Sequence, residues 1–141
     1  MKDLVVDASV AIKWFADEDH SLVARRLLKV SVRLHGPELL LAECGNILWK
    51  WVRRKELSPK EAEDALGVLI QIPILLHKHG ALSLPALQIA TRLDATQYDS
   101  LYMALAVKLN CPLVTADRKL FDKAKKSPLK DFVTWIEDAP T

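Results

Sequence analysis

Short apolar runs alternate along the chain with longer segments of helical periodicity. The first run is Leu-Val-Val at residues 4–6, and it stops at Asp7. A continuous apolar run without alternation is typical of a strand covered on both faces, as in a parallel sheet flanked by helices. Further short segments are predicted to be strands at residues 32–35, 72–77, 112–117 and 132–136.

The segments between these strands have the spacing of helices. Pro37 is expected in the first turn of one helix, because that position does not need a backbone N–H. Ser58 and Glu61 have the spacing of a capping box, and Ser83 before Pro85 predicts another helix start. The predicted helices span residues 9–15, 22–30, 37–49, 83–93, 97–109 and 120–126, with one more beginning at residue 58.

This alternation of strands and helices predicts a three-layer α/β/α domain with a mainly parallel, roughly five-stranded central sheet. The 141 residues correspond to a single domain, residues 1–141, large enough to bury about two thirds of the surface that the unfolded chain exposes. Hydrophobic residues make up 50% of the chain and charged residues 27%. This composition is globular and excludes the disordered and fibrous classes.

Two features of the sequence bear on its location in the cell. The N-terminus has no charged and then apolar leader, and no apolar run approaches the roughly 18 residues of a membrane span. Cys44 and Cys111 lie far apart and form no C-x-x-C pair, so both are expected to be buried free thiols. A cytoplasmic protein without a membrane partner is therefore expected.

Acidic residues stand at positions where such a fold places its ligands. Asp7 and Asp117 each end a predicted strand, and ligands of parallel sheets bind beyond the carboxyl ends of the strands. Asp99 lies in the first turn of the helix before the last of these strands, and Glu43 lies inside an apolar helix. Structural alternatives exist, with Asp7 and Asp117 as helix caps and Asp99 as a complement to the helix dipole.

Glu43 is the hardest of these acids to explain as a structural residue. A carboxylate within an apolar helix is either buried with a partner or faces a cavity, since uncompensated burial is costly. Asn46, three residues further on, shares its helix face. Ser9 and Thr115 are candidates to orient a carboxylate or to touch a phosphate. Alternatively, Ser9 is a helix cap and Thr115 an ordinary strand residue.

Convergence of the acids would dictate their chemistry. Two unit charges ~6 Å apart repel by roughly 3 kcal/mol at an effective dielectric of ~20, so the cluster must take up protons or bind a cation. Hard oxygen ligands predict Mg²⁺ or Mn²⁺ rather than zinc. Such an ion activates a water and neutralises a phosphoryl oxygen, which makes phosphodiester hydrolysis the natural reaction.

Basic side chains add a second and weaker indication. The formal net charge is only +2, which does not by itself indicate a nucleic-acid partner. Clusters of Lys and Arg at residues 25–29, 50–55 and 119–126 would follow a phosphate backbone, although such runs are usually solvated helix faces.

Motifs at fitting separations follow one another along the chain. They are Asp7-Ala8-Ser9, Glu43 with Asn46, Tyr98-Asp99-x-x-Tyr102-x-Ala104-Leu105-Ala106, and Thr115-Ala116-Asp117 with Leu120. Together they resemble the PIN domain family, in particular the VapC-type toxins of bacterial and archaeal toxin-antitoxin pairs. No single motif is specific, but the ordered set spans almost the whole chain.

The resemblance implies a metal-dependent endoribonuclease that uses Mg²⁺ or Mn²⁺. Its acidic quartet would be Asp7, Glu43, Asp99 and Asp117. In that family pattern, Asp7 and Asp99 would be the main metal ligands and Asp117 an additional or water-mediated one. Glu43 would be a ligand or would orient the attacking water. The resemblance also implies an RNA substrate, a homodimer, and a cognate antitoxin that covers the groove.

Two other classes of function stay open on the sequence alone. A receiver-like signalling domain also places acids and Mg²⁺ at strand ends. It would need a lone acceptor Asp on a middle strand and a Lys at the end of a late one, which residues 74–77 and 113–117 do not supply. A catalytically silent binding module of the same fold is opposed by the presence of all four acids, and a metal titration separates it from a nuclease.

Overall fold

A parallel β-sheet forms the centre of the computed structural model, which describes residues 1–140. Its five strands pair in the order β3-β2-β1-β4-β5, and every pairing is parallel. The strands are β1 (Lys2–Val6), β2 (Val32–Pro37), β3 (Ile74–His77), β4 (Leu113–Thr115) and β5 (Val133–Trp135). The predicted strands are therefore confirmed, and the mainly parallel sheet is wholly parallel.

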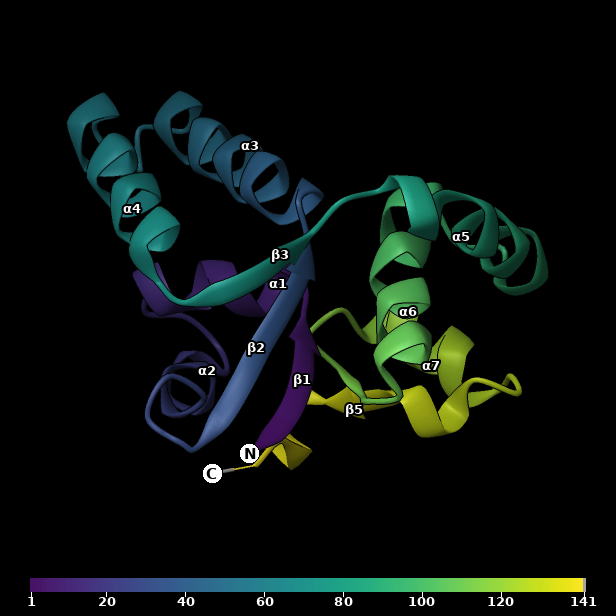
Figure 1. Ribbon diagram of the computed structural model, residues 1–141. Helices are drawn as coiled ribbons and strands as arrows, with labels where there is room; N and C mark the ends of the chain where they lie inside the picture. The colour runs from purple at the N-terminus through teal and green to yellow at the C-terminus, as the bar shows by residue number, and fades with distance from the viewer. Residues whose placement is uncertain (141) are drawn as a thin grey trace.

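Helices cover both faces of this sheet and complete the predicted three layers (Figure 1). Helices α1 to α4 lie on one side of the strands and α5 to α7 on the other. The α-helices are α1 (Ala8–Ala11), α2 (Ser21–Arg26), α3 (Leu39–Arg53), α4 (Pro59–Gln71), α5 (Gly80–Leu93), α6 (Gln97–Leu109) and α7 (Arg118–Lys125). Short 3₁₀ turns are η1 (Ile12–Phe15), η2 (Lys130–Phe132) and η3 (Ile136–Asp138).

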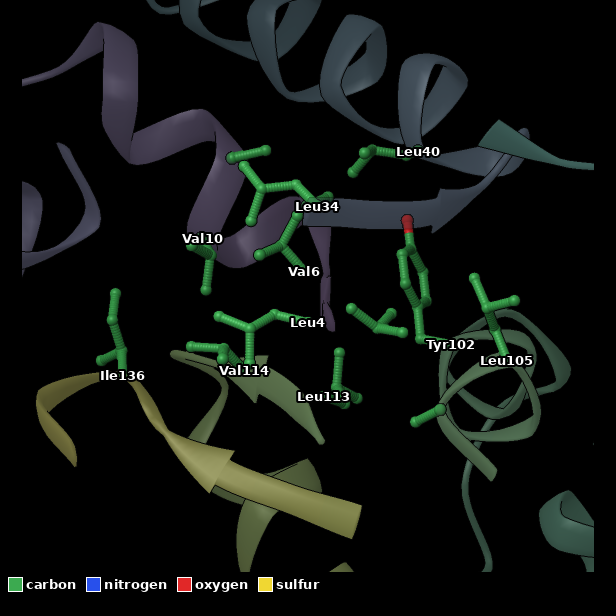
Figure 2. Packing of buried hydrophobic residues seen from close by; sticks show 14 of the residues in the cluster. Leu4, Val6, Val10, Leu34, Leu40, Tyr102, Leu105, Leu113, Val114 and Ile136 are labelled. Carbon is green, nitrogen blue, oxygen red and sulfur yellow. The ribbon is translucent and has the colours of Figure 1, made fainter. Parts of the chain in front are cut away.

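The core lies on both sides of the two central strands, β1 and β4. Leu4, Val6 and Val114 pack with Val10 of α1 on one face, whereas Leu113 faces helix α6 on the other (Figure 2). Helix α6 is buried on every side from Ser100 to Ala106, so polar groups on it are held by packing from all directions. The predicted buried thiols are confirmed, with Cys44 and Cys111 both free and buried.

The predicted start of α3 is wrong. Pro37 belongs to β2, where it pairs with His77 of β3, and the helix begins at Leu39. The backbone N–H of Glu38 donates to the carbonyl of His77 at 2.9 Å, so strand contacts continue to the residue before the helix. Tertiary pairing of β2 with β3 therefore overrides the local preference of proline for a first helical turn.

The predicted cap at Ser83 is also wrong, because α5 begins one turn earlier, at Gly80, and contains Pro85. Leu82 and Ala86 are both buried, which draws the turn before Pro85 into the helix. The hydroxyl of Ser83 donates to the carbonyl of His79 at 2.7 Å instead of accepting from a backbone N–H.

Helix α2 is shorter than predicted and ends at Arg26. Val23 and Leu27 are buried, whereas Leu22 is 72% exposed and Leu28 is 42% exposed. The Leu27 N–H donates to the Ala24 carbonyl and the Leu28 N–H to the Arg25 carbonyl, each three residues back, so the chain tightens into a 3₁₀-type turn where α2 ends.

Within residues 1–140, none of the helices combines the length and the apolar character that a bilayer crossing requires.

The capping box at the start of α4 is confirmed and gives a stability prediction. The Ser58 hydroxyl accepts from the Glu61 N–H at 3.1 Å, and the Glu61 carboxylate accepts from the Ser58 N–H at 2.9 Å. Ser58→Ala is expected to lower the free energy of unfolding by about 1 kcal/mol, since it leaves a helix N–H without its acceptor. Chemical denaturation measures this loss. Glu63→Ala, on the same helix, is the control, and equal stability of the two variants would contradict the capping role.

Candidate active site

Two of the predicted acids emerge at the carboxyl end of the sheet. Strands β1 and β4 are neighbours, with Val6 paired to Val114, so the residues that follow them leave the sheet side by side. Asp7 is the N-cap of α1, and Asp117 is the N-cap of α7. The structural alternative of helix capping is therefore correct for both, and the same two turns place both carboxyls at the edge where parallel sheets bind ligands.

Asp7 is buried and is held by three donors. Its Oδ1 accepts from the Ser9 hydroxyl at 2.5 Å and from the Val10 N–H at 3.2 Å, and its Oδ2 accepts from the Thr115 hydroxyl at 2.5 Å. The hydroxyls are held in turn, because Ser9 accepts from the Ala116 N–H and Thr115 from the Asp117 N–H, each at 3.0 Å. Ser9 and Thr115 thus fix the orientation of the Asp7 carboxyl and tie β1 to the segment after β4.

Burial sets the charge of this group. Desolvation raises the pKa of Asp7 from 3.8 to about 7, against the effect of the three donors. The negative charge of Asp99 raises this pKa further. Asp7 is therefore close to half-protonated at neutral pH unless a cation offsets the cost of its charge.

Glu43 has the partner that an acid in an apolar helix requires. The hydroxyl of Tyr102, on α6, donates to the Glu43 carboxylate at 2.6 Å. Tyr102 is only 1% exposed, so its hydroxyl is fixed by the core, and Figure 2 shows the ring extending from α6 toward the end of β2. Desolvation raises the pKa of Glu43, the bond from Tyr102 opposes this, and Asp99 raises the pKa again.

Asp99 lies in the first turn of α6. The hydroxyl of Thr96 caps this helix by accepting from the Asp99 N–H at 3.0 Å. Desolvation raises the pKa of Asp99, and the charge of Asp117 raises it further, whereas the ammonium of Lys123 lowers it. The carboxylate of Asp117, in turn, accepts two backbone hydrogen bonds, from the N–H groups of Lys119 and Leu120, and both go to Oδ1.

Asp99 is the electrostatic link among the four predicted acids. Its charge raises the pKa of Asp7 and of Glu43, and its own pKa is raised by Asp117. Over residues 1–140, however, no three His, Cys, Asp or Glu side chains are arranged to hold one metal ion as they stand. Among the described residues, the acids thus share one electrostatic environment without forming a closed ligand cage.

Two hollows flank the first turn of α6. One, of about 450 Å³, includes Glu43, Asn46, Lys50 and Tyr98 in its lining, so Asn46 faces the same space as Glu43. The other, of about 390 Å³, is lined in part by Asp99, Asp117, Lys119 and Lys123. Glu43 therefore lines one of these hollows and Asp99 and Asp117 the other, whereas the buried Asp7 is in the lining of neither.

The sequence reasoning assigned no role to Tyr102 or Thr96, which the structure places in direct contact with this site. A signal was available for Tyr102, which stands three residues after Asp99 and so shares its face of α6. That the hydroxyl meets Glu43, 59 residues away in the sequence, depends on where the sheet places α3 on one face and α6 on the other.

Comparison with known proteins adds an independent finding. The sequence matches the profile of the PIN domain over residues 4–126. It is 34% identical over 122 residues to Ribonuclease VapC3 of Pyrobaculum aerophilum, a match that covers 85% of this chain and 93% of the relative. It is 37% identical over 123 residues to Ribonuclease VapC1 of Mycobacterium tuberculosis, covering 85% and 90%. The crystal structure of PAE2754 from Pyrobaculum aerophilum superposes with a TM-score of 0.69 at 25% identity, covering 96% of this chain and 85% of that chain.

The raised pKa of Asp7 predicts a pH-dependent stability. An acid whose pKa rises on folding stabilises the folded protein at a pH below the pKa that it has in the unfolded chain. This contribution is lost as the pH rises through the pKa that the acid has in the folded protein. Without divalent metal, Asp7→Asn is therefore expected to gain stability over the wild type between about pH 4 and pH 7, reaching at most ~4 kcal/mol.

Denaturant titrations in EDTA across this pH range measure the difference. Asp122→Asn, an exposed substitution on α7, is the control. A stability difference between Asp7→Asn and the wild type that does not change with pH would contradict the buried, protonatable carboxyl.

Proposed function

The chain belongs to the PIN domain family, and from that premise we propose that it is a metal-dependent endoribonuclease, the toxin of a VapBC-type toxin-antitoxin pair. One observation carries the proposal. Asp7, Glu43 and Asp117 all interact electrostatically with Asp99 at the carboxyl edge of the sheet. Relatives more than 30% identical over most of the chain bear the name ribonuclease. The match to the PIN domain over residues 4–126 leaves the receiver-like alternative without support.

The donor chemistry of this site fits a hard divalent cation. The acids offer only carboxylate oxygens, which suit Mg²⁺ or Mn²⁺. A carboxylate has about four lone-pair positions, and the three donors to Asp7 leave room for a further interaction. We assign Asp7 and Asp99 as the main ligands and Asp117 as an additional or water-mediated one. A bound ion of this kind supplies an activated water and neutralises charge on a phosphoryl oxygen.

The protein's own residues position the reacting groups. Glu43 orients the attacking water and accepts its proton, because its raised pKa makes it a stronger base than an exposed glutamate. Tyr102 holds the Glu43 carboxyl in one orientation through its 2.6 Å hydrogen bond. Ser9 and Thr115 do the same for Asp7, and Asn46 lies where it can support Glu43 or contact the substrate.

The remaining parts of the proposal rest on the family resemblance. The chain acts as one domain, residues 1–141, in the cytoplasm, and forms a homodimer. Its activity is restrained by a cognate antitoxin that covers the acidic site. A catalytically silent binding module of the same fold is the alternative, and the cleavage experiment below separates the two.

The central test is cleavage of RNA by the isolated protein. The wild type with Mg²⁺ or Mn²⁺ is expected to cut a panel of structured RNAs, and EDTA is expected to stop it. Asp99→Asn is expected to lower the rate by at least about 100-fold, because it removes both a ligand and the charge shared by the cluster. Asp64→Asn, an exposed acid on α4, is the matched control and should retain full activity.

Each outcome of this test has a distinct meaning. Cutting that survives both EDTA and Asp99→Asn would overturn the metal mechanism. A wild type that binds metal but cuts none of the RNAs would favour the silent binding module.

The bond from Tyr102 to Glu43 gives a second, signed prediction. This bond lowers the pKa of Glu43, so Tyr102→Phe is expected to raise that pKa while the ring keeps its packing. The acid limb of the pH–rate profile should then move to higher pH, and kcat should fall roughly tenfold with KM little changed. Thr91→Val serves as the control, because it removes an exposed hydroxyl on α5 that bonds only the Gln88 carbonyl of its own helix. An unshifted profile for Tyr102→Phe would contradict the assignment of Glu43 as the base.

A further inference from the structure

An exposed aromatic ring stands directly beside the acidic site. Tyr98 is 61% exposed, and it precedes Asp99 in the first turn of α6. Its side chain lines the hollow of about 450 Å³ together with Glu43, Asn46 and Lys50. We call this space the Tyr98 hollow. An exposed aromatic ring contributes little to the stability of the fold, because its apolar surface stays in contact with water. Beside a candidate active site, such a ring is available to bind a ligand.

Basic side chains extend from this hollow along α3. Glu43, Asn46, Lys50 and Arg53 follow one another at intervals of three or four residues and so share one helix face. Lys50 also lines a second hollow, of about 330 Å³, with Trp49, Arg53 and Arg54. The Arg53 guanidinium lies 5.0 Å from the centroid of the half-exposed Trp49 ring. A track of cations and aromatic rings therefore leads away from the carboxylates.

The hollow on the other side of Asp99 has a different character. Lys119 and Lys123 contribute ammonium groups to it, and its lining includes no aromatic residue. A polyanion that crosses Asp99 thus meets cations on both sides but an aromatic platform only on the Tyr98 side. This asymmetry suits a nucleic-acid strand whose backbone contacts both hollows and whose base is held in one.

We propose that the Tyr98 hollow binds one unpaired nucleotide of the RNA next to the scissile phosphate. The base stacks on the ring of Tyr98, and Lys50 contacts the adjoining phosphate. Only an unstacked, unpaired base presents a free face to such a ring, so the hollow would not hold a base within a duplex. This inference rests on the proposed ribonuclease function and adds to it the residues that hold the base and the phosphate beside the cleavage site.

The first measurement uses a short unstructured RNA with a single 2-aminopurine, whose fluorescence falls when it stacks. Full-length protein in EDTA, which prevents metal-dependent cutting, is titrated into this RNA. The wild type is expected to quench the probe. Tyr98→Ala should raise the dissociation constant about tenfold and abolish the quenching, whereas Tyr98→Phe, which keeps the ring, should stay within about twofold of the wild type. Leu22→Ala, exposed on the distant α2, is the matched control.

The second measurement concerns the phosphate contact. Lys50→Gln should weaken binding and reduce the slope of log affinity against log salt by roughly 0.7, the contribution of one phosphate on a single strand. Lys60→Gln removes a comparably exposed charge on α4 and should leave the slope unchanged. An unchanged slope for Lys50→Gln would remove Lys50 from the proposal.

The outcomes separate this inference from the proposed function. Tyr98-dependent quenching by a wild type that cuts no RNA would support the hollow and overturn the ribonuclease. A wild type that cuts RNA, with Tyr98→Ala unchanged in KM and in quenching, would overturn the hollow alone. Equal affinity for the fully paired duplex of the same sequence would also overturn it. Loss of RNA affinity together with loss of the dimer would assign Tyr98 to a contact between copies instead.

Discussion

Repulsion among acids at one edge of the sheet is the constraint on which the rest of this site depends. Asp99 interacts with Asp7, Glu43 and Asp117, and desolvation already raises the pKa of Asp7, of Glu43 and of Asp99. Two unit charges ~6 Å apart at an effective dielectric of ~20 would repel by roughly 3 kcal/mol. A fold gains nothing from such a cluster as a structural element. A bound cation would offset the repulsion between the carboxylates. The same cation is the one that the proposed hydrolysis requires.

The central strands and helix α6 hold the acids in place. Pairing of β1 with β4 places Asp7 and Asp117 in adjacent turns, and Ser9 and Thr115 bind both turns together through the Asp7 carboxyl. On the other face, α6 is buried from Ser100 to Ala106, so Tyr102 is fixed by packing, and Asp99 lies in the first turn of this same helix. Glu43 is then held by the hydroxyl of Tyr102. Each acid is therefore oriented by a different element, and the core of the protein determines their relative placement.

The sequence predicted the elements well wherever local chemistry decides them. Continuous apolar runs identified the strands, and the Ser58–Glu61 spacing identified a helix start that depends only on neighbouring residues. Predictions failed where distant contacts decide, as at Pro37, which β3 holds in the sheet, and at Ser83, which burial of Leu82 draws into α5. The acids could be named because their positions at strand ends and helix starts are local features. The contact of Tyr102 with Glu43 could not, since it joins helices on opposite faces of the sheet and depends on how the sheet places α3 and α6.

The most direct test of this account is the position of a bound ion. Crystals soaked in Mn²⁺ and measured where manganese scatters anomalously would locate it without reference to activity. The account predicts an anomalous peak within coordination distance of carboxylate oxygens of Asp7 and Asp99, with Asp117 bound directly or through water. A peak elsewhere, for example at the hydrogen-bonded pair of His35 and His77, with none at the acids would contradict it.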